Sequence, residues 1–383
     1  MKAAVLHEVN QPLQIEDVDI SSPGPREVLV RTRASGVCHS DLHFVEGLYS
    51  TTMPVLLGHE AAGTVEAVGS QVHYVSPGDR VICCLSVFCG VCERCTTGRP
   101  VLCSRTGLLR GPDEAPRLSQ GGVPVTQFAN LGAYAEMMLV HENSLVKIEQ
   151  DIGFEQMALI GCGATTGLGA ALNTAKVEPG STVAVIGAGG VGLNAIQGAK
   201  LAGALRIIAI DAVEDKLTLA REFGATDVID ASTGDAEKQV KDLTGGGVDY
   251  SFEAIGKKET AELSFEILRA GGTATIIGMI PLGTKIELDG YAFLRERRIQ
   301  GSSMGSNHFR VDMPRYIDFY LQGRLKLDEL VTRRLKLEDI NDAFKYMKEC
   351  VSLEKIIQSI QNSLYANYLT EKALKECFLC LVQ

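Results

Sequence analysis

The middle of the chain alternates short apolar runs with amphipathic stretches. Apolar runs predict strands at residues 181–186, 206–210, 227–229, 248–253 and 273–278. Helical patterns lie between strands of this set, at residues 193–202, 216–223 and 260–269. Strands that alternate with helices indicate βαβ units and a parallel sheet.

The first part of the chain, to about residue 150, follows a different pattern. Short apolar or alternating segments, at residues 27–33, 62–68 and 80–82, lie between glycine- and proline-rich turns. This spacing predicts a β-rich sheet or barrel. From about residue 306 the pattern turns mixed, and amphipathic helices are expected at residues 311–322 and 337–348.

A glycine-rich motif joins the first two elements of the βαβ region. Gly187-Ala-Gly189-Gly-Val191-Gly192 has the form G-x-G-x-x-G, follows an apolar strand and opens a helix. In that context the glycines permit a tight turn and let a pyrophosphate approach the helix N-terminus. Asp211 ends the next strand, where its carboxylate can bind ribose hydroxyls and would repel a 2′-phosphate. The motif predicts a dinucleotide-binding Rossmann domain that prefers NAD to NADP.

Composition excludes some classes of partner. A chain of 383 residues suits two domains, and 45% hydrophobic with 22% charged residues is typical of a globular protein. The formal net charge of -10 argues against nucleic acid or an anionic membrane as the main partner. The N-terminus lacks a signal-peptide pattern, and no apolar run reaches the roughly 18 residues of a spanning helix. We therefore expect a cytoplasmic protein.

Four of the eleven cysteines form a cluster, Cys89-x-x-Cys92-x-x-Cys95-x7-Cys103. In a reducing compartment such spacing is typical of a metal site rather than of disulfides. Four thiolates can close a tetrahedral shell around Zn²⁺, which leaves no open position for chemistry. An iron–sulfur cluster uses the same ligand type and remains an alternative.

Three further potential ligands are dispersed along the chain. Cys38, His59 and Cys162 each lie in a glycine-punctuated segment. Two thiolates and one imidazole would leave the fourth position of a zinc ion open to water or substrate, as in the catalytic zinc site of alcohol dehydrogenase. A lone cysteine or histidine is more often a core residue, so spacing alone does not join these three.

Together with the glycine motif and the cysteine cluster, these segments resemble the zinc-containing medium-chain alcohol dehydrogenase family, over roughly residues 1–348. The resemblance implies that Cys38, His59 and Cys162 hold a catalytic zinc, and hence two zinc ions per chain. It implies an α/β fold, in which a β-rich GroES-like catalytic domain accompanies a doubly wound Rossmann coenzyme domain. The implied activity is reversible oxidation of a small alcohol to an aldehyde or ketone, with hydride transfer to NAD.

The resemblance also implies roles for residues around the catalytic zinc. Ser40 takes the alcohol proton, and His43 passes it to solvent through the cofactor ribose. Asp41 hydrogen-bonds His59 and fixes its tautomer. Glu60 lies near the metal and helps ligand exchange.

Cofactor and substrate positions follow from the same comparison. Thr166 and Val191 are expected behind the nicotinamide ring, Lys216 at the adenosine ribose, and His39 near the pyrophosphate. A pocket for a primary or aromatic alcohol is expected to be lined by Tyr49, Leu85, Tyr134, Met279 and Ile280.

The expected domain organisation is a catalytic domain at residues 1–163, a Rossmann domain at 164–306 and a returning catalytic segment at 307–361. Residues 362–383 form an atypical C-terminal tail. A parallel sheet exposes unpaired backbone groups at its edge, and we take residues 273–280 as the edge strand through which two copies would join. We expect a homodimer, with a homotetramer as the alternative.

Two other functions remain open. A thiol-dependent formaldehyde dehydrogenase or nitrosothiol reductase of the same family would use the same metal and cofactor, and the long segment at residues 104–130 resembles the dimeric branch that includes such enzymes. A non-catalytic NAD-sensing protein is the alternative of another class. The intact set of Cys38, His59, Cys162 and Ser40 argues against it.

Overall fold

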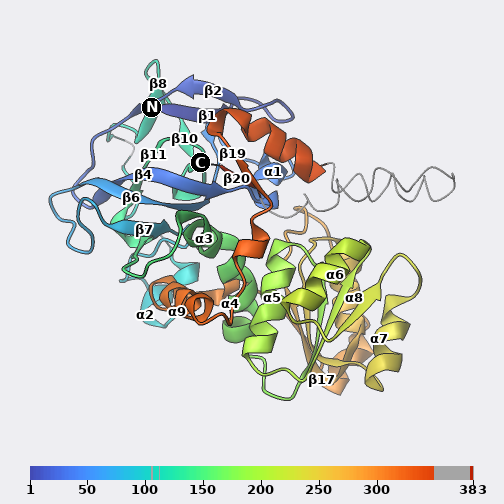
Figure 1. Cartoon of the computed structure of the whole chain (residues 1–383). Helices are drawn as coiled ribbons and strands as arrows, with labels where there is room; N and C mark the ends of the chain where they lie inside the picture. Colours follow the sequence, from blue (N-terminus) through green and yellow to red (C-terminus); the bar gives the residue numbers. More distant parts are fainter. Residues whose placement is uncertain (105–106, 112, 349–379, 383) are drawn as a thin grey trace. The chain divides into compact units, whose positions relative to one another are not determined.

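The computed structural model describes residues 1–104, 107–111, 113–348 and 380–382, and the chain divides into two compact units (Figure 1). The first unit comprises Met1–Cys162 and the described residues from His308 onward, and the second comprises Gly163–Asn307. Apart from Cys380–Val382, the expected C-terminal tail lies outside the described residues, as does the end of the returning segment.

The second unit is built on a six-stranded parallel sheet, as the alternating pattern predicted. The strand order is β15-β14-β13-β16-β17-β18, which places the first strand of the sheet in the middle. This is the 3-2-1-4-5-6 order of a doubly wound Rossmann fold. The strands are β13 (Thr182–Ile186), β14 (Arg206–Asp211), β15 (Asp227–Asp230), β16 (Val248–Glu253), β17 (Leu268–Ile276) and β18 (Arg298–Gly301).

The helices that pack against this sheet are α5 (Gly190–Leu201), α6 (Glu214–Phe223), α7 (Ala236–Thr244) and α8 (Lys258–Glu266). The hydrophobic pattern predicted all but α7. The reason is that α7 buries only Ala236 and Val240, so its apolar face is too narrow to give a helical periodicity. Its capping signal was present, since the Asp235 side chain accepts a hydrogen bond from the Lys238 N–H.

The edge of the sheet differs from the expectation. Residues 273–280 were expected to supply the edge strand, but β17 is paired on both sides, with β16 and with β18. The edge is β18, which the hydrophobic pattern did not predict because its four residues are mixed in polarity and none is buried. The prediction that residues 273–280 form the edge strand was therefore wrong, because the edge is the neighbouring strand, β18.

The first unit is β-rich, as predicted. Its seven-stranded sheet is centred on β4 (Glu27–Gly36), which pairs antiparallel with β6 (Glu60–Val68), β11 (Met137–His141) and β20 (Cys380–Val382). The sheet is completed by β7 (Arg80–Cys83), β12 (Leu145–Lys147) and β19 (Arg333–Leu335). Two smaller sheets comprise β1 (Lys2–Leu6), β2 (Gln14–Asp17), β5 (Val55–Leu56) and β10 (Thr126–Gln127), and β3 (Asp19–Ile20), β8 (Leu118–Gln120) and β9 (Val123–Pro124).

Short helices accompany these sheets. They are α1 (His39–Val45), α2 (Glu93–Thr96), α3 (Phe154–Leu159) and α9 (Phe309–Leu321), and residues 340–348 are also helical. After α3 the helix widens into a π turn, Ile160–Ala164, before α4 (Thr165–Gly169) continues in the second unit. Such widened turns occur frequently at functional sites.

A buried carboxylate anchors part of the long segment that follows the cysteine cluster. Glu27, at the start of β4, accepts hydrogen bonds from Arg117 Nε at 2.7 Å and from Arg110 Nη2 at 2.5 Å. Burial raises the pKa of Glu27, but the two arginines more than offset this, and its pKa is lowered to about 2. The ion pairs tie the segment to the central strand of the sheet.

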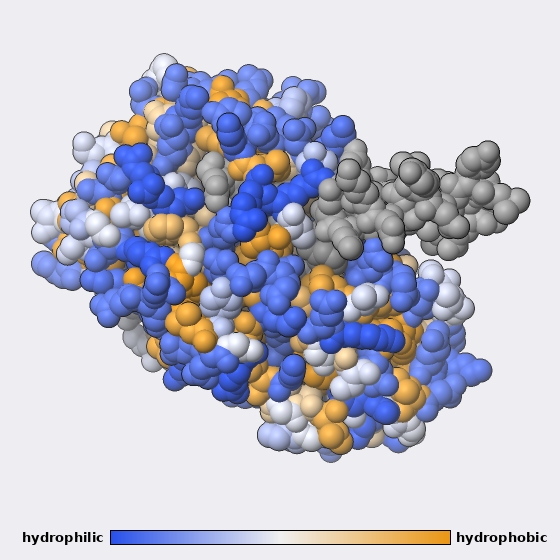
Figure 2. All heavy atoms as spheres, viewed as in Figure 1, coloured by the Kyte–Doolittle hydropathy of each residue, from blue (hydrophilic) through white to orange (hydrophobic). Residues whose placement is uncertain are grey.

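Polar residues dominate the face of the molecule drawn in Figure 2, where hydrophobic residues lie in small groups among hydrophilic ones. Within the described part of the chain, no helix has both the length and the apolar character needed to cross a membrane.

Candidate functional site

A fully buried carboxylate organises the first group of predicted site residues. Asp41, in α1, has no exposed surface, and its Oδ1 accepts hydrogen bonds from the Gly58 N–H at 3.0 Å and from His59 Nδ1 at 3.1 Å. Its Oδ2 accepts the hydroxyl hydrogen of Tyr134 at 2.9 Å. Because Nδ1 of His59 donates to Asp41, the lone pair of Nε2 is left available for a metal ion.

The position of Gly58 requires a glycine. Its φ of +93° lies in the left-handed region, and a Cβ there would lie 2.7 Å from the backbone nitrogen of Tyr134. Only glycine permits this approach, which brings the Gly58 N–H to Asp41 and places His59 directly before β6.

The three dispersed ligands meet in the first unit. Cys38 precedes α1, His59 precedes β6, and Cys162 lies in the π turn, yet their ligand atoms all fall within 4.8 Å of one another. Cys162 and His59 are buried, and Cys38 is partly exposed. Two sulfurs and an oriented imidazole at this spacing fit one Zn²⁺ ion with a fourth position left over.

The proton equilibria of the three groups are linked. A hydrogen bond from Cys162 holds the pKa of Cys38 well below its usual range, and the same hydrogen bond, together with burial, raises the pKa of Cys162. Burial lowers the pKa of His59, but Asp41 and Cys38 more than offset this, so that its pKa is raised. Of the two thiols, Cys38 is the one whose surroundings favour the deprotonated form that a metal ion binds.

The predicted proton-relay residues lie on α1 beside Cys38. The Cys38 thiol is 3.6 Å from the Ser40 hydroxyl oxygen. His43 is half-buried, its ring stacks on Tyr49 with centroids 6.1 Å apart, and burial lowers its pKa. Its Nδ1 is buried and has no hydrogen-bond partner among the described residues. A largely neutral imidazole with such a nitrogen can accept a proton near neutral pH.

Glu60 is buried directly after His59, at the start of β6. A Cβ on Gly36 would lie 2.6 Å from Glu60 Oε2, so Gly36 makes the room for this carboxylate. The charge of Glu60 contributes to the raised pKa of Cys162. The structure therefore brings Glu60 close to the ligand set.

The residues predicted for a substrate pocket are divided between the two units. Tyr134 has no exposed surface and donates its hydroxyl to Asp41, so it supports the predicted metal site. Its role at the substrate stays a prediction. Leu85 is partly buried against the core of the seven-stranded sheet, and Tyr49 is partly exposed beside His43. Met279 and Ile280 follow β17 in the second unit, and their role at the substrate stays a prediction.

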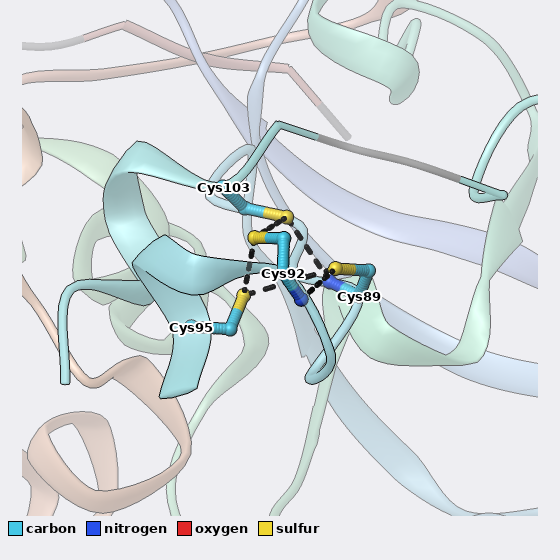
Figure 3. Close-up of side chains that lie close together, drawn as sticks. All are labelled: Cys89, Cys92, Cys95 and Cys103. Atoms are coloured by element: carbon cyan, nitrogen blue, oxygen red, sulfur yellow. Dashed lines mark hydrogen bonds between the residues drawn. The ribbon is translucent and has the colours of Figure 1, made fainter. Parts of the chain in front are cut away.

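The four clustered cysteines converge, as Figure 3 shows. Cys92 Sγ lies 3.5 Å from Cys95 Sγ and 3.8 Å from Cys103 Sγ, and the Sγ atoms of Cys89 and Cys95 are 3.9 Å apart. A tetrahedron of thiolates at the Zn–S distance of about 2.3 Å has edges of about 3.8 Å. The spacing fits a single tetrahedral ion and is too small for a cluster of several irons.

Hydrogen bonds favour thiolates at Cys89 and Cys92 in this lobe, residues 89–103. Those from Ser104 and Cys95 lower the pKa of Cys92 to about 5, whereas burial raises the pKa of Cys95 to about 12. Two contacts that the sequence did not reveal attach the lobe to the rest of the first unit. His308 Nε2 is 2.9 Å from the Gly98 carbonyl, and Asn143 Nδ2 donates at 2.8 Å to the carbonyl of Phe88, directly before the lobe.

The glycine motif forms the turn between β13 and α5. Gly187 has a φ of +96°, and a Cβ on Gly192 would lie 1.7 Å from the Gly187 carbonyl oxygen, so both positions require glycine. Nothing would obstruct a Cβ on Gly189, which leaves open space above the turn. Asp211 Oδ2 accepts a hydrogen bond from the Ala188 N–H at 2.8 Å, which joins the end of β14 to the glycine turn.

Of the other residues predicted to bind the cofactor, the segments that contain Thr166 and Val191 lie close together. A Cβ on Gly167, which follows Thr166, would lie 2.3 Å from the Val191 carbonyl oxygen, so α4 packs tightly on the start of α5. Lys216 lies in α6, five residues after Asp211 in the sequence, and is partly exposed. His39 is the first residue of α1 in the first unit and is exposed. The roles of these residues at a cofactor stay predictions.

Comparisons with known proteins agree with this geometry. Residues 24–150 match the family model described as alcohol dehydrogenase GroES-like domain, and residues 190–322 match the model described as zinc-binding dehydrogenase. An alcohol dehydrogenase zinc-binding domain protein from Burkholderia ambifaria is 33% identical with a TM-score of 0.87, over 100% of this chain and 98% of that one.

The chain belongs to the zinc-containing medium-chain alcohol dehydrogenase family. It is an oxidoreductase of the zinc-dependent dehydrogenase type.

Two further relatives of this dehydrogenase fold cover 100% of the chain and 98% of their own. Benzyl alcohol dehydrogenase from Acinetobacter calcoaceticus is 31% identical, with a TM-score of 0.85. A putative zinc-binding dehydrogenase from Sinorhizobium meliloti, solved bound to NADP, is 29% identical with a TM-score of 0.76. The predicted family and the predicted pairing of a GroES-like with a Rossmann domain are confirmed.

Proposed function

We propose that this dehydrogenase oxidises small alcohols reversibly to aldehydes or ketones and passes the hydride to NAD. The observation that carries the proposal is the three-ligand set of Cys38, His59 and Cys162, with the imidazole oriented by a buried carboxylate. A closed site would serve structure alone, whereas a three-ligand site leaves a position for substrate. The cysteine lobe supplies the closed site, and we assign one zinc ion to each.

When bound, the zinc ion supplies Lewis acidity toward the substrate oxygen, and NAD accepts the hydride. The chain's own residues then handle the proton. Ser40, beside Cys38, accepts the alcohol proton, and His43 receives it for release to solvent. Asp41 keeps Nε2 of His59 directed away from the carboxylate, because it holds the Nδ1 hydrogen.

The direct test combines metal analysis with a substrate panel. Purified protein is expected to contain two zinc ions per chain and to reduce NAD with primary or aromatic alcohols. Assays with and without glutathione separate this activity from a thiol-dependent formaldehyde dehydrogenase. A protein with full zinc content that turned over no alcohol or aldehyde with either cofactor would exclude the proposal.

Asp211 is proposed to select NAD over NADP. Its side chain ends β14 at the glycine turn and is 7% exposed, so a 2′-phosphate placed there would meet its charge at close range. Asp211→Gly is expected to raise the ratio of kcat/KM for NADP to that for NAD at least about tenfold, since about 1.4 kcal/mol of repulsion corresponds to that factor.

The matched control is Asp211→Asn. It keeps an oxygen to accept the Ala188 N–H but removes the negative charge, so the two variants separate loss of charge from loss of the turn contact. A cofactor ratio unchanged in both variants would show that Asp211 is not the selector.

We propose that the protein is a homodimer that joins through β18. This strand has a neighbour on one side only among the described residues, and the segment before it exposes Tyr291 by 67% and Leu294 by 79%. Two such edges related by a two-fold axis would continue the sheet and cover these side chains. Light scattering is expected to give twice the chain mass of 41.1 kDa, and Leu294→Asp is expected to shift it toward the monomer.

A further inference from the structure

Glu253 is a buried acidic residue for which neither the metal sites nor the glycine motif accounts. It ends β16, at the carboxyl edge of the parallel sheet, and has no exposed surface. Its side-chain Oε1 accepts three hydrogen bonds, from the N–H groups of Ile255 at 2.9 Å and Gly256 at 2.7 Å and from the Thr260 hydroxyl at 2.8 Å. The carboxylate therefore holds the turn that leads from β16 into α8.

The same residue holds the turn that follows the neighbouring strand, β17. The Glu253 backbone carbonyl accepts hydrogen bonds from the N–H groups of Ile277 at 2.8 Å and Gly278 at 3.0 Å. Glu253 thus accepts hydrogen bonds from two turns that are adjacent in space and well separated in the sequence. We call these residues the β16 turn (254–256) and the β17 turn (277–280).

The two turns pack backbone against backbone. A Cβ on Gly278 would lie 2.2 Å from the Gly256 nitrogen and 2.6 Å from Glu253 Oε2. A Cβ on Gly256 would lie 2.7 Å from the Met279 carbonyl oxygen. A small displacement of the Glu253 carboxylate would therefore be transmitted to both turns, because neither has space to move independently.

Each turn leads to a predicted part of the cofactor and substrate site. In the β16 turn, the Ala254 N–H donates to the Ile186 carbonyl at 2.9 Å, and a Cβ on Gly187 would lie 2.6 Å from Ile255 Cγ1. The β17 turn contains Met279 and Ile280, which were predicted to line the substrate pocket. In open α/β sheets, ligands bind outside the carboxyl ends of the strands, where both turns lie.

We propose that Glu253 is a positioning residue for cofactor binding. It holds the β16 turn against the glycine turn, and it fixes the position of the β17 turn at the carboxyl edge of the sheet. Its other oxygen, Oε2, is buried and has no hydrogen-bond partner among the described residues. A buried acceptor left in this state is unfavourable for stability, so core packing alone does not account for a glutamate here. The proposal rests on the proposed NAD-linked function.

The test compares Glu253→Ala with Glu253→Gln, which keeps an oxygen for the three donors. Glu253→Ala is expected to raise the Kd for NADH and the KM for NAD about tenfold, the size of one lost charge-assisted interaction, and to change kcat at saturating NAD by less than about threefold. Glu253→Gln is expected to restore both constants to within about threefold of wild type. Hydrogen exchange at the amides of Ile255 and Gly256, which donate to the side chain, should accelerate in Glu253→Ala and not in Glu253→Gln.

Ser251→Ala is the matched control. Ser251 lies on the same face of β16, is equally buried, and donates its hydroxyl to the Ser264 carbonyl at 2.6 Å. This variant is expected to lower the melting temperature without changing the Kd for NADH. If Glu253→Ala does not fold, Thr260→Val carries the test, because it removes one donor to Oε1 and should raise the Kd about threefold.

The outcomes separate the inference from the function on which it rests. Wild-type protein that bound neither NADH nor NADPH would overturn both. Wild-type protein that bound NADH normally, with Glu253→Ala or Thr260→Val binding it equally well, would overturn the positioning role alone. Glu253→Ala and Ser251→Ala could lower the melting temperature equally and leave the Kd for NADH and the KM for NAD unchanged. That result would show that Glu253 has a structural role only.

Discussion

Replacement of Cys162 by serine is expected to abolish alcohol turnover while the protein stays folded. Cys162 is one of three ligands in the set that leaves a position for substrate, and a hydroxyl is a much weaker zinc ligand than a thiolate. The loss of several kcal/mol of charge stabilisation corresponds to a decrease in kcat/KM of about 1,000-fold or more. His59→Ala is expected to have an effect of the same order.

The measurements are activity, zinc content and thermal unfolding of the same preparations. Zinc content is expected to fall from two ions to one per chain. Cys83→Ala is the control, because Cys83 is fully buried in β7 but belongs to neither ligand set, and it should lose stability and retain activity. Activity above about one tenth of wild type in Cys162→Ser would contradict the assignment of the catalytic site, since that corresponds to less than about 1.4 kcal/mol.

Replacement of Cys95 by serine is expected to lower the stability of the protein strongly, whereas replacement of Cys162 is expected to abolish activity. The lobe lacks an apolar core of its own, since neither α2 nor the short helix Pro100–Leu102, both within the described residues, buries a side chain. The four thiolates and their metal ion must therefore supply most of its folding free energy, and structural zinc sites contribute about 10–16 kcal/mol of apparent binding energy in small domains. A loss of about 4 kcal/mol would lower the melting temperature of a chain of 383 residues by roughly 5 °C.

Thr97→Ala is the control for the lobe. Thr97 is exposed next to α2, and its hydroxyl donates to backbone carbonyls of that helix, so its loss should change the melting temperature little. Cys95→Ser protein that retains its catalytic zinc is expected to turn over alcohol below its lowered melting temperature. An equal decrease in melting temperature in Cys95→Ser and Cys162→Ser would show that the structural and catalytic roles are not assigned to separate sites.

Local signals made much of the fold predictable. The strands of the Rossmann unit are continuous apolar runs because a parallel sheet is buried on both faces, and its glycine turn needs small residues at fixed spacings. The elements that were not predicted lacked such signals: α7 buries only two residues, and β18 buries none. Their places are set by the sheet to which they attach.

The two predicted metal sites also differ in how far the sequence alone predicts them. The cysteine lobe could be predicted from spacing, because its four ligands lie within one short loop and must be close together. Cys38, His59 and Cys162 could be joined only by resemblance, because their proximity depends on β4, β6 and the π turn meeting in space.

The sequence by itself therefore determined the features in which neighbouring residues suffice: the βαβ alternation, the glycine turn with Asp211, and the closed cysteine cluster. Tertiary structure alone decided the features that depend on distant segments. It placed the Tyr134 hydroxyl on Asp41, made β18 the edge strand in place of β17, and brought two turns together at Glu253. The physical reason is that a pattern of hydrophobic and polar residues specifies which face of an element is buried, whereas strand order and packing select the partner that it meets.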